Sequence, residues 1–177
     1  MRDDQAEPVL DYIAYETFLD DVDAVARKLD AESWRPDFLV GVGRGGLVPA
    51  AFLSHRLDIS MLSVDVSSGD AGFSDELMVK LAGKTTDGRR ILVIDDINDS
   101  GMTIATFRDA LAGHGGQGDC VRVAVLINNL RSRATVDYWS RTIDRARDKR
   151  WFVFPWEAQA ERHMLVQEAV SVPERLA

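Results

Sequence analysis

The spacing of apolar residues divides the chain into predicted helices and buried strands. Four segments carry apolar residues at helical spacing and are predicted to be helices: 15–30, 47–57, 102–112 and 157–170. Four short apolar runs are predicted to be buried strands: 38–42, 61–66, 91–94 and 121–127. From residue 67 to residue 89 the pattern dissolves into Gly, Ser, Asp and Lys, which predicts a long loop with at most a short strand.

The alternation of these strands and helices, with short connections, predicts an α/β fold: an open, mostly parallel sheet flanked by helices. The uninterrupted apolar run 91–94 is typical of a strand that is covered on both faces. The chain shows no repeat, low-complexity tract or linker, so we expect one domain over 1–177 with a core of about 15–134. In such sheets ligands bind beyond the carboxyl ends of the strands, and we expect the functional residues there.

Composition and charge exclude several function classes. The 177 residues are 46% hydrophobic and 28% charged, as in ordinary globular proteins, and no apolar run is long enough to cross a membrane. The N-terminus is acidic and unlike a signal peptide, so we expect a cytoplasmic protein with no membrane partner. The single cysteine, Cys120, and three scattered histidines build neither a disulfide nor a zinc site. A net charge of −8 argues against nucleic-acid binding, which needs a basic face.

One basic segment, 141–150, is open to two interpretations. Its arginines and lysine are interspersed with Asp144 and Asp148, which is typical of a solvated surface. The same cations would also suit an electrostatic funnel for a small polyanion.

A glycine-rich turn follows the first predicted buried strand. Residues 41–46 match the G-x-G-x-x-G pattern of dinucleotide-binding turns, and Asp65 stands about where a ribose-binding acid is expected. A plain tight turn, or a loop for another phosphate, explains the glycines equally well. Arg44 adds a cation, which favours an anion in this loop.

A second motif, over residues 91–103, is far more specific. Four apolar residues end in Asp95 and Asp96, and the segment 99–103, Asp-Ser-Gly-Met-Thr, then opens a helix. A helix start presents unpaired N–H groups, which together with hydroxyl groups hold a phosphate monoester. Two carboxylates at a strand end accept hydrogen bonds from ribose hydroxyls or hold Mg²⁺. A mere strand end followed by a helix cap does not account for thirteen positions in this order.

The 91–103 segment resembles the phosphoribosyl pyrophosphate signature of the type I phosphoribosyltransferases. Residues 42–50 are similar to the pyrophosphate loop of the microbial xanthine–guanine and hypoxanthine phosphoribosyltransferases, which displaces most of the dinucleotide interpretation. Residues 151–157, Trp-Phe-Val-Phe-Pro-Trp-Glu, are similar to the base-covering hood of that subgroup. The resemblance spans about residues 15–157, and it implies a hood over about 135–157 together with the C-terminal helix.

The resemblance implies an enzyme that joins a free purine base to phosphoribosyl pyrophosphate with the help of Mg²⁺. The products would be pyrophosphate and a nucleoside monophosphate, and the enzyme would serve purine salvage, as a homo-oligomer. The residues implied to bind phosphoribosyl pyrophosphate are Arg44, Gly45, Asp95, Asp96, Asp99, Ser100, Gly101, Met102 and Thr103. Asp99 would be the catalytic acid–base at the imidazole side of the purine.

The same resemblance assigns the base, the metal and a flap. Trp151 would stack on the base, and Phe152 and Asn129 would contact its edge. Asp95 and Asp96 would reach the metal directly or through the ribose, and Glu157 would reach it through water or simply begin a helix. The segment 67–89 would be a mobile flap over the reacting centre.

Two departures from the family pattern concern the base and the flap. Relatives place a lysine that bonds the purine carbonyl where this chain has Asn129, and many carry Ser-Tyr where this chain has Ser68-Gly69. A neutral amide leads us to expect a 6-oxopurine, hypoxanthine or guanine before xanthine. Two other functions stay open on the sequence alone: a non-catalytic phosphoribosyl pyrophosphate or nucleotide sensor of the same fold, and a dinucleotide-binding oxidoreductase.

Overall fold

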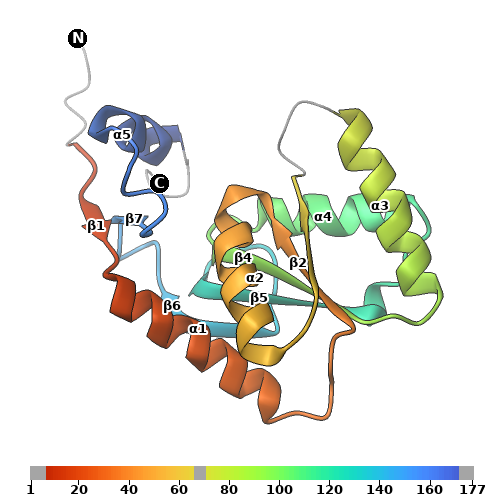
Figure 1. Ribbon diagram of the computed structural model, residues 1–177. Coiled ribbons are helices and arrows are strands. Elements are labelled where there is room, and N and C mark those ends of the chain that lie inside the picture. Colours follow the sequence, from red (N-terminus) through yellow and green to blue (C-terminus); the bar gives the residue numbers. More distant parts are fainter. Residues whose placement is uncertain (1–6, 66–70, 172–177) are drawn as a thin grey trace.

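A five-stranded parallel sheet forms the centre of the molecule (Figure 1). The computed structural model describes residues 7–65 and 71–171. The strand order is β3-β2-β4-β5-β6. The strands are β2 (Phe38–Val42), β3 (Met61–Val64), β4 (Ile91–Asn98), β5 (Val121–Asn129) and β6 (Tyr138–Ile143). The prediction of an open parallel α/β sheet flanked by helices is therefore confirmed.

Helices cover both faces of this sheet. They are α1 (Tyr15–Asp30), α2 (Gly43–Leu57), α3 (Ala71–Thr86) and α4 (Met102–Gly113), and a short 3-10 turn, η1 (Gly118–Cys120), precedes β5. Along β4, Leu92 and Ile94 pack with α1 and α2, whereas Ile91 and Val93 pack with α3 and α4. Successive side chains of a strand point to opposite faces, so an unbroken apolar run is what a doubly covered strand requires.

A smaller unit lies beyond one end of the sheet. Strand β1 (Leu10–Tyr12) pairs in parallel with β7 (Trp151–Val153), and helix α5 (Arg162–Ser171) lies next to this pair in Figure 1. The ion pair between Arg150 and Asp11, with 2.9 Å between Nη1 and Oδ2, also joins these two segments. The hood thus consists of an N-terminal strand as well as the C-terminal part of the chain.

The prediction of a long loop over 67–89 is wrong, because α3 occupies residues 71–86. Leu77, Met78, Leu81 and Ala82 recur at helical spacing and pack into the core beside α4. The glycines and polar residues around them obscured this pattern in the sequence. A helix buried along one face cannot be the mobile flap over its whole length, and Ser68-Gly69 lie outside the described residues.

Other boundaries differ by a few residues. Helix α2 begins at Gly43 rather than at residue 47, β4 continues to Asn98, and α5 begins at Arg162 rather than at residue 157. The sheet continues past residue 134, because β6 pairs with β5 and ends at Ile143. In the described ranges, no helix is long and apolar enough to span a membrane.

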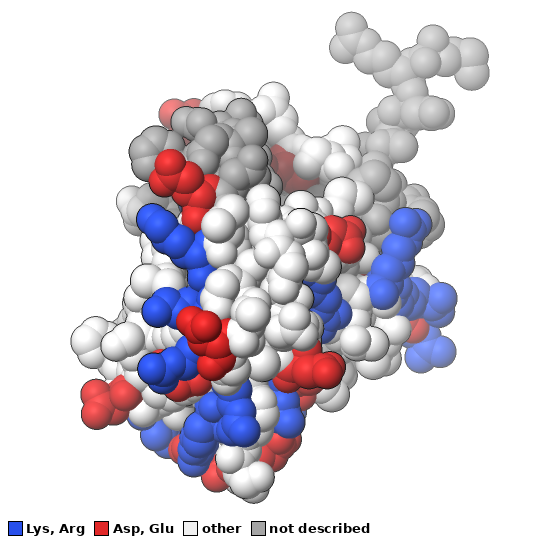
Figure 2. All heavy atoms as spheres, turned by 90° about the vertical axis from the view of Figure 1, so that its right-hand side faces the viewer, with Lys and Arg blue, Asp and Glu red and all other residues white. Residues whose placement is uncertain are grey.

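The surface carries charges of both signs. On the face drawn in Figure 2, Lys and Arg side chains are interspersed with Asp and Glu side chains. This mixture differs from the continuous basic face that duplex binding requires.

Candidate active site

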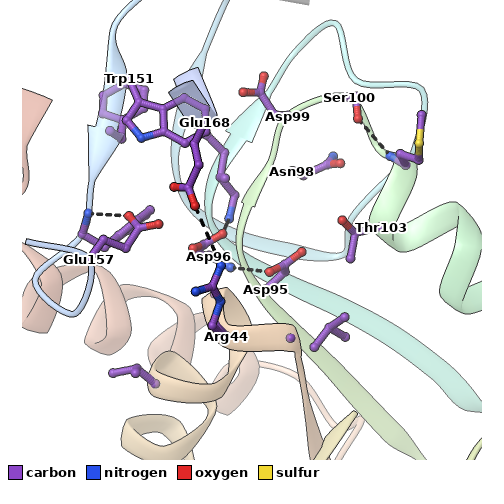
Figure 3. Close-up of a pocket in the computed structure, with 18 of the residues that line it drawn as sticks. Arg44, Asp95, Asp96, Asn98, Asp99, Ser100, Thr103, Trp151, Glu157 and Glu168 are labelled. Atoms are coloured by element: carbon purple, nitrogen blue, oxygen red, sulfur yellow. Dashed lines mark hydrogen bonds and ion pairs between the residues drawn. The ribbon is translucent and has the colours of Figure 1, made fainter. Parts of the chain in front are cut away.

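A cavity of about 650 Å³ lies between the carboxyl ends of β2 and β4 and the hood. Its floor and walls come from four places: the start of α2, the end of β4 with the turn into α4, the segment around Arg145 to Glu157, and helix α5. Figure 3 shows Asp95 and Asp96 above Arg44, with Ser100 and Thr103 on one side and Trp151 and Glu157 on the other. The cavity therefore lies where an open parallel sheet is expected to bind its ligand.

The turn from β2 into α2 brings backbone close to the carboxylates. Gly43 has a φ of +56°, and α2 starts there directly. A Cβ atom on Gly46 would lie 2.0 Å from the backbone oxygen of Ile94, so only glycine lets this helix start approach the end of β4 so closely. Arg44 is 92% exposed, and its Nη2 lies 3.8 Å from Oε1 of Glu168 on α5. This arginine is available to an anion at the mouth of the cavity.

The carboxylates of Asp95 and Asp96 lie at the end of β4 without a cationic partner in the described part of the chain. Burial raises the pKa of Asp95 to about 7, against a hydrogen bond from the Asp96 N–H that lowers it. Burial raises the pKa of Asp96 well above its ordinary value, and the charges of Asp95 and Glu157 raise it further. Both carboxylates therefore favour a proton, a metal ion or hydroxyl donors beside them.

Glu157 follows β7 in the hood and lies across the cavity from these acids. Its Oε2 accepts a hydrogen bond of 2.9 Å from the Phe154 N–H, and burial raises its pKa. The described residues contain no cluster of three or more His, Cys, Asp or Glu side chains suited to a metal. A site of one or two carboxylates is what Mg²⁺ uses when substrate phosphates complete its shell. The donor set thus fits a Mg²⁺ whose remaining ligands come from outside the protein.

The turn from β4 into α4 forms an anion cradle. Gly101 has a φ of +86°, and a Cβ atom there would lie 2.6 Å from the Ala134 backbone nitrogen. Oγ of Ser100 accepts a 3.2 Å hydrogen bond from the Met102 N–H, and Thr103 lies exposed in the first turn of α4. The first turn of a helix leaves backbone N–H groups without intrahelical partners, and the helix dipole adds a partial positive charge.

Asp99 has a partner that the sequence did not reveal. The side chain of Arg145, only 3% exposed, donates from Nε to Asp99 Oδ1 at 2.8 Å and from Nη2 to Oδ2 at 2.7 Å. The two residues are 46 positions apart, and Arg145 belongs to the basic segment that we interpreted as solvated surface or anion funnel. Neither interpretation describes it, because this arginine is a buried partner of a cavity carboxylate.

Asn129, assigned to the base edge, does not line the cavity. Its side chain is buried and engaged with backbone: Nδ2 donates to the Asp99 carbonyl at 3.0 Å, and Oδ1 accepts from the N–H groups of Arg131 and Arg145. The structure therefore gives no support to a contact between this amide and a base. Asn129 instead holds two loops together behind Asp99.

Aromatic side chains form the hood side of the cavity. Trp151 and Phe152 of β7, which the sequence assigned to the base, line it together with Phe154 and Trp156. The rings of Phe154 and Trp156 stack at 4.8 Å with an angle of 12° between their planes, and Phe18 of α1 packs edge-on against Trp156 at 5.3 Å. The wall is thus anchored in the main core, and a flat ligand entering here meets a rigid apolar surface.

All but one of the site residues predicted from the sequence line this cavity. Arg44, Gly45, Asp95, Asp96, residues 99–103, Trp151, Phe152 and Glu157 do so. The exception is Asn129. Sequence reasoning missed Arg145, which is one of several charges in the segment 141–150, and Glu168, because neither belongs to a local motif.

A family model described as the phosphoribosyl transferase domain matches residues 11–162. The chain belongs to this family. The match covers the five-stranded sheet and most residues that line the cavity, and it confirms the resemblance drawn from the 91–103 segment.

The relatives include several purine phosphoribosyltransferases. A xanthine-guanine phosphoribosyltransferase of Idiomarina loihiensis is 42% identical over 88 residues, which is 48% of this chain and 53% of that protein. The aligned segment thus spans about half the length of this relative. The purine phosphoribosyltransferase from Pyrococcus horikoshii has a TM-score of 0.62 and 27% identity over 83% of this chain and 93% of its own. A hypothetical protein from Neisseria gonorrhoeae with bound ppGpp has a TM-score of 0.64 over 98% of this chain and 99% of its own. At 21% identity it shows the fold alone.

Proposed function

We propose that this protein transfers the 5-phosphoribosyl group from phosphoribosyl pyrophosphate to a free purine base, releasing pyrophosphate and a nucleoside monophosphate in purine salvage. One observation carries the proposal: an anion cradle, two carboxylates without a cationic partner in the described residues and an aromatic wall surround one cavity. These are the groups that a 5′-phosphate, a ribose and a base need, in the order in which the substrate presents them. The purine relatives among the comparisons support the same class of acceptor.

The substrate's phosphate groups meet the two helix starts. The first turn of α4 with Ser100 and Thr103 binds the 5′-phosphate through N–H and hydroxyl groups. Arg44 and the Gly45 backbone, at the start of α2, bind the pyrophosphate. A cation beside the leaving group stabilises the charge that builds there as the bond between the anomeric carbon and the pyrophosphate oxygen breaks.

The ribose lies over Asp95 and Asp96. Their carboxylates accept hydrogen bonds from its two hydroxyl groups or share a Mg²⁺ with them, and Glu157 stands close enough to Asp96 to influence its charge. A bound Mg²⁺ would supply positive charge to the pyrophosphate. Because Asp95 is buried and Asp96 half-buried, each gains more from such a partner than an exposed acid would.

The base stacks against the hood wall. Trp151 offers it a flat face, and stacking of a base on an aromatic ring contributes about 1–3 kcal/mol whatever the base. Asp99 holds or moves the proton of its imidazole ring, at the junction of the cradle and the hood. The hood also restricts water at the anomeric carbon, which protects a cation-like centre from hydrolysis.

The direct test is an assay of pyrophosphate release with phosphoribosyl pyrophosphate, Mg²⁺ and a panel of hypoxanthine, guanine, xanthine, adenine and orotate. We expect release with at least one 6-oxopurine and formation of the matching nucleoside monophosphate by mass spectrometry. Tight binding of phosphoribosyl pyrophosphate or a nucleotide without release by any base would instead indicate a regulatory binding protein. Binding of a nicotinamide cofactor would contradict the proposal.

The setting of this activity is also part of the proposal. We place it in the cytoplasm, and we expect a homo-oligomer, which sedimentation velocity of the full chain would test.

A further inference from the structure

Asp99 and Arg145 form one unit in the cavity wall. The guanidinium grips both carboxylate oxygens, with distances of 2.7 to 3.1 Å, and the two side chains are 13% and 3% exposed. A bidentate pair in this geometry is strong and orients both groups. Any ligand group that reaches Asp99 therefore meets Arg145 beside it.

The unit is fixed from behind by Asn129. This one side chain donates to the Asp99 carbonyl and accepts from the Arg145 N–H, so it joins the turn after β4 to the loop after β6. The ring of Phe152 lies 5.3 Å from the Arg145 guanidinium carbon and supports it from the hood side. The position of the pair is thus set by buried contacts rather than by a mobile surface loop.

Arg145 retains a donor after these contacts are counted. A guanidinium has five N–H groups. Nε–H and one Nη2–H serve Asp99, and the two Nη1–H groups serve the carbonyls of Asp148 and Arg150. The second Nη2–H has no acceptor among the described residues. Arg145 lines the cavity, as do Trp151 and Phe152.

We propose that Arg145 determines which base is used: its remaining N–H donor, beside the acceptor oxygens of Asp99, selects a base with a carbonyl oxygen next to a ring N–H. This inference rests on the proposed phosphoribosyl transfer. A 6-oxopurine presents this pair of groups when its imidazole ring carries the proton on the nitrogen nearest the carbonyl. Adenine presents an amino group in place of the carbonyl, so a donor would face the Arg145 donor and leave both unpaired.

The test compares kcat/KM for hypoxanthine and for adenine in matched variants. Arg145→Met removes the donors and keeps a long side chain, and Arg145→Lys keeps a charge without the planar fork. Arg150→Met is the control, because Arg150 also lies over the Phe152 ring, at 5.4 Å, but contacts Asp148 and Asp11 rather than Asp99.

The readout is the ratio of the two kcat/KM values, because a general disturbance of the site lowers both together. In the wild type we expect hypoxanthine to be favoured by about 10²-fold or more. Arg145→Met should lower this preference at least about tenfold, Arg145→Lys should retain part of it, and Arg150→Met should leave it unchanged. An unchanged ratio in a folded, active Arg145→Met variant would overturn the inference.

A wild-type arm keeps the test decisive if the Arg145 variants do not fold. Unsubstituted purine, which lacks the carbonyl oxygen, and 7-deazahypoxanthine, which lacks the imidazole nitrogen nearest the carbonyl, are compared with hypoxanthine as competitive inhibitors. Each should bind at least about tenfold more weakly. Equal inhibition by hypoxanthine and unsubstituted purine, or a wild type that prefers adenine, would reject the role of Arg145. Failure of every base to release pyrophosphate would instead reject the proposed transfer itself.

Discussion

The carboxylates that line the cavity have two contrasting environments. At the end of β4, Asp95 is buried and Asp96 is half-buried, neither has a cation beside it in the described part of the chain, and desolvation raises the pKa of both. One turn further along the chain, Asp99 has an arginine on both of its oxygens. Three acids within five residues of sequence thus differ in their charged partners, because the tertiary structure places an arginine beside Asp99 and none beside Asp95 or Asp96 in the described part of the chain.

The difference separates two functions. A carboxylate without a partner is costly to keep charged, so it gains most when a metal ion or donor hydroxyl groups arrive with the substrate. A carboxylate already paired is fixed in position and in its role as acceptor before the substrate arrives. On the proposed function, the ribose end of the cavity is therefore stabilised by its ligand, whereas the base end is preorganised by the protein.

The largest effect on activity should come from breaking the pair between Asp99 and Arg145. Asp99→Asn removes the carboxylate that we propose to face the base, and it should lower kcat by about 10²–10⁴-fold, the usual range for loss of a general acid–base. Binding of phosphoribosyl pyrophosphate, measured by calorimetry, should change little. Asp109→Asn, on an exposed position of α4, is the matched control. A turnover number in Asp99→Asn equal to that of the wild type would remove this residue from the mechanism.

The lack of a cationic partner at Asp95 should make the stability of the folded protein depend on pH. The pKa of Asp95 is about 7 in the folded protein, above its value in the unfolded chain, so the folded state retains a proton that the unfolded state releases. This contribution is fully present below about pH 4 and is lost as the pH rises to about 7. Without Mg²⁺ and substrate, the free energy of unfolding should therefore fall over this window.

Asp95→Asn should remove that loss. At pH 8 the variant should exceed the wild type in unfolding free energy by on the order of a few kcal/mol in urea titrations, while its transferase activity is lost. The exposed substitution Asp87→Asn should leave the pH dependence unchanged. A wild-type stability that rises between pH 5.5 and 8 would contradict the assignment of Asp95 as an unpaired, destabilising acid.

The cradle between the two groups should be sensitive to a single methyl group. Gly101→Ala places a side chain at a φ of +86° and against Ala134, so the unfolding free energy should fall by about 1–2 kcal/mol and the KM for phosphoribosyl pyrophosphate should rise. Gly113, at the other end of α4, serves as the control, because no atom lies within 4 Å of the position that an added methyl group would occupy. Gly113→Ala should leave KM unchanged, and equal KM values in both variants would refute the cradle.

The smallest effect is expected at the mouth of the cavity. Glu168→Gln removes the partner of Arg44, but the pair spans 3.8 Å between exposed side chains. Thermal denaturation should reveal a change of less than about 0.5 kcal/mol. A loss of more than about 2 kcal/mol would show that α5 depends on this contact, contrary to its geometry.

Most residues of the proposed ribose and phosphate site could be predicted from local sequence. The residues 91–103 form one continuous strand, turn and helix start, so their order in the chain is their order in space. The apolar runs of β2, β4 and β5 identified a doubly covered sheet for the same reason, since side-chain alternation along a strand is a local property. The unpredicted α3 shows the limit of this reasoning, because Leu77 and Leu81 indicate a helix only when the core they pack against is known.

The arrangement of residues at the proposed base end depends on contacts between segments that are distant in the sequence. Three-residue strands such as β1 and β7 have no detectable periodicity, and they pair across the length of the chain. Arg145 and Asp99 are 46 residues apart, and Asn129 reaches both only because β5 lies next to β4 in the sheet. A sequence pattern records which side chains are present, but burial and the partner of each charge arise only when separate segments pack together, and those two properties set what Asp95 and Asp99 can do.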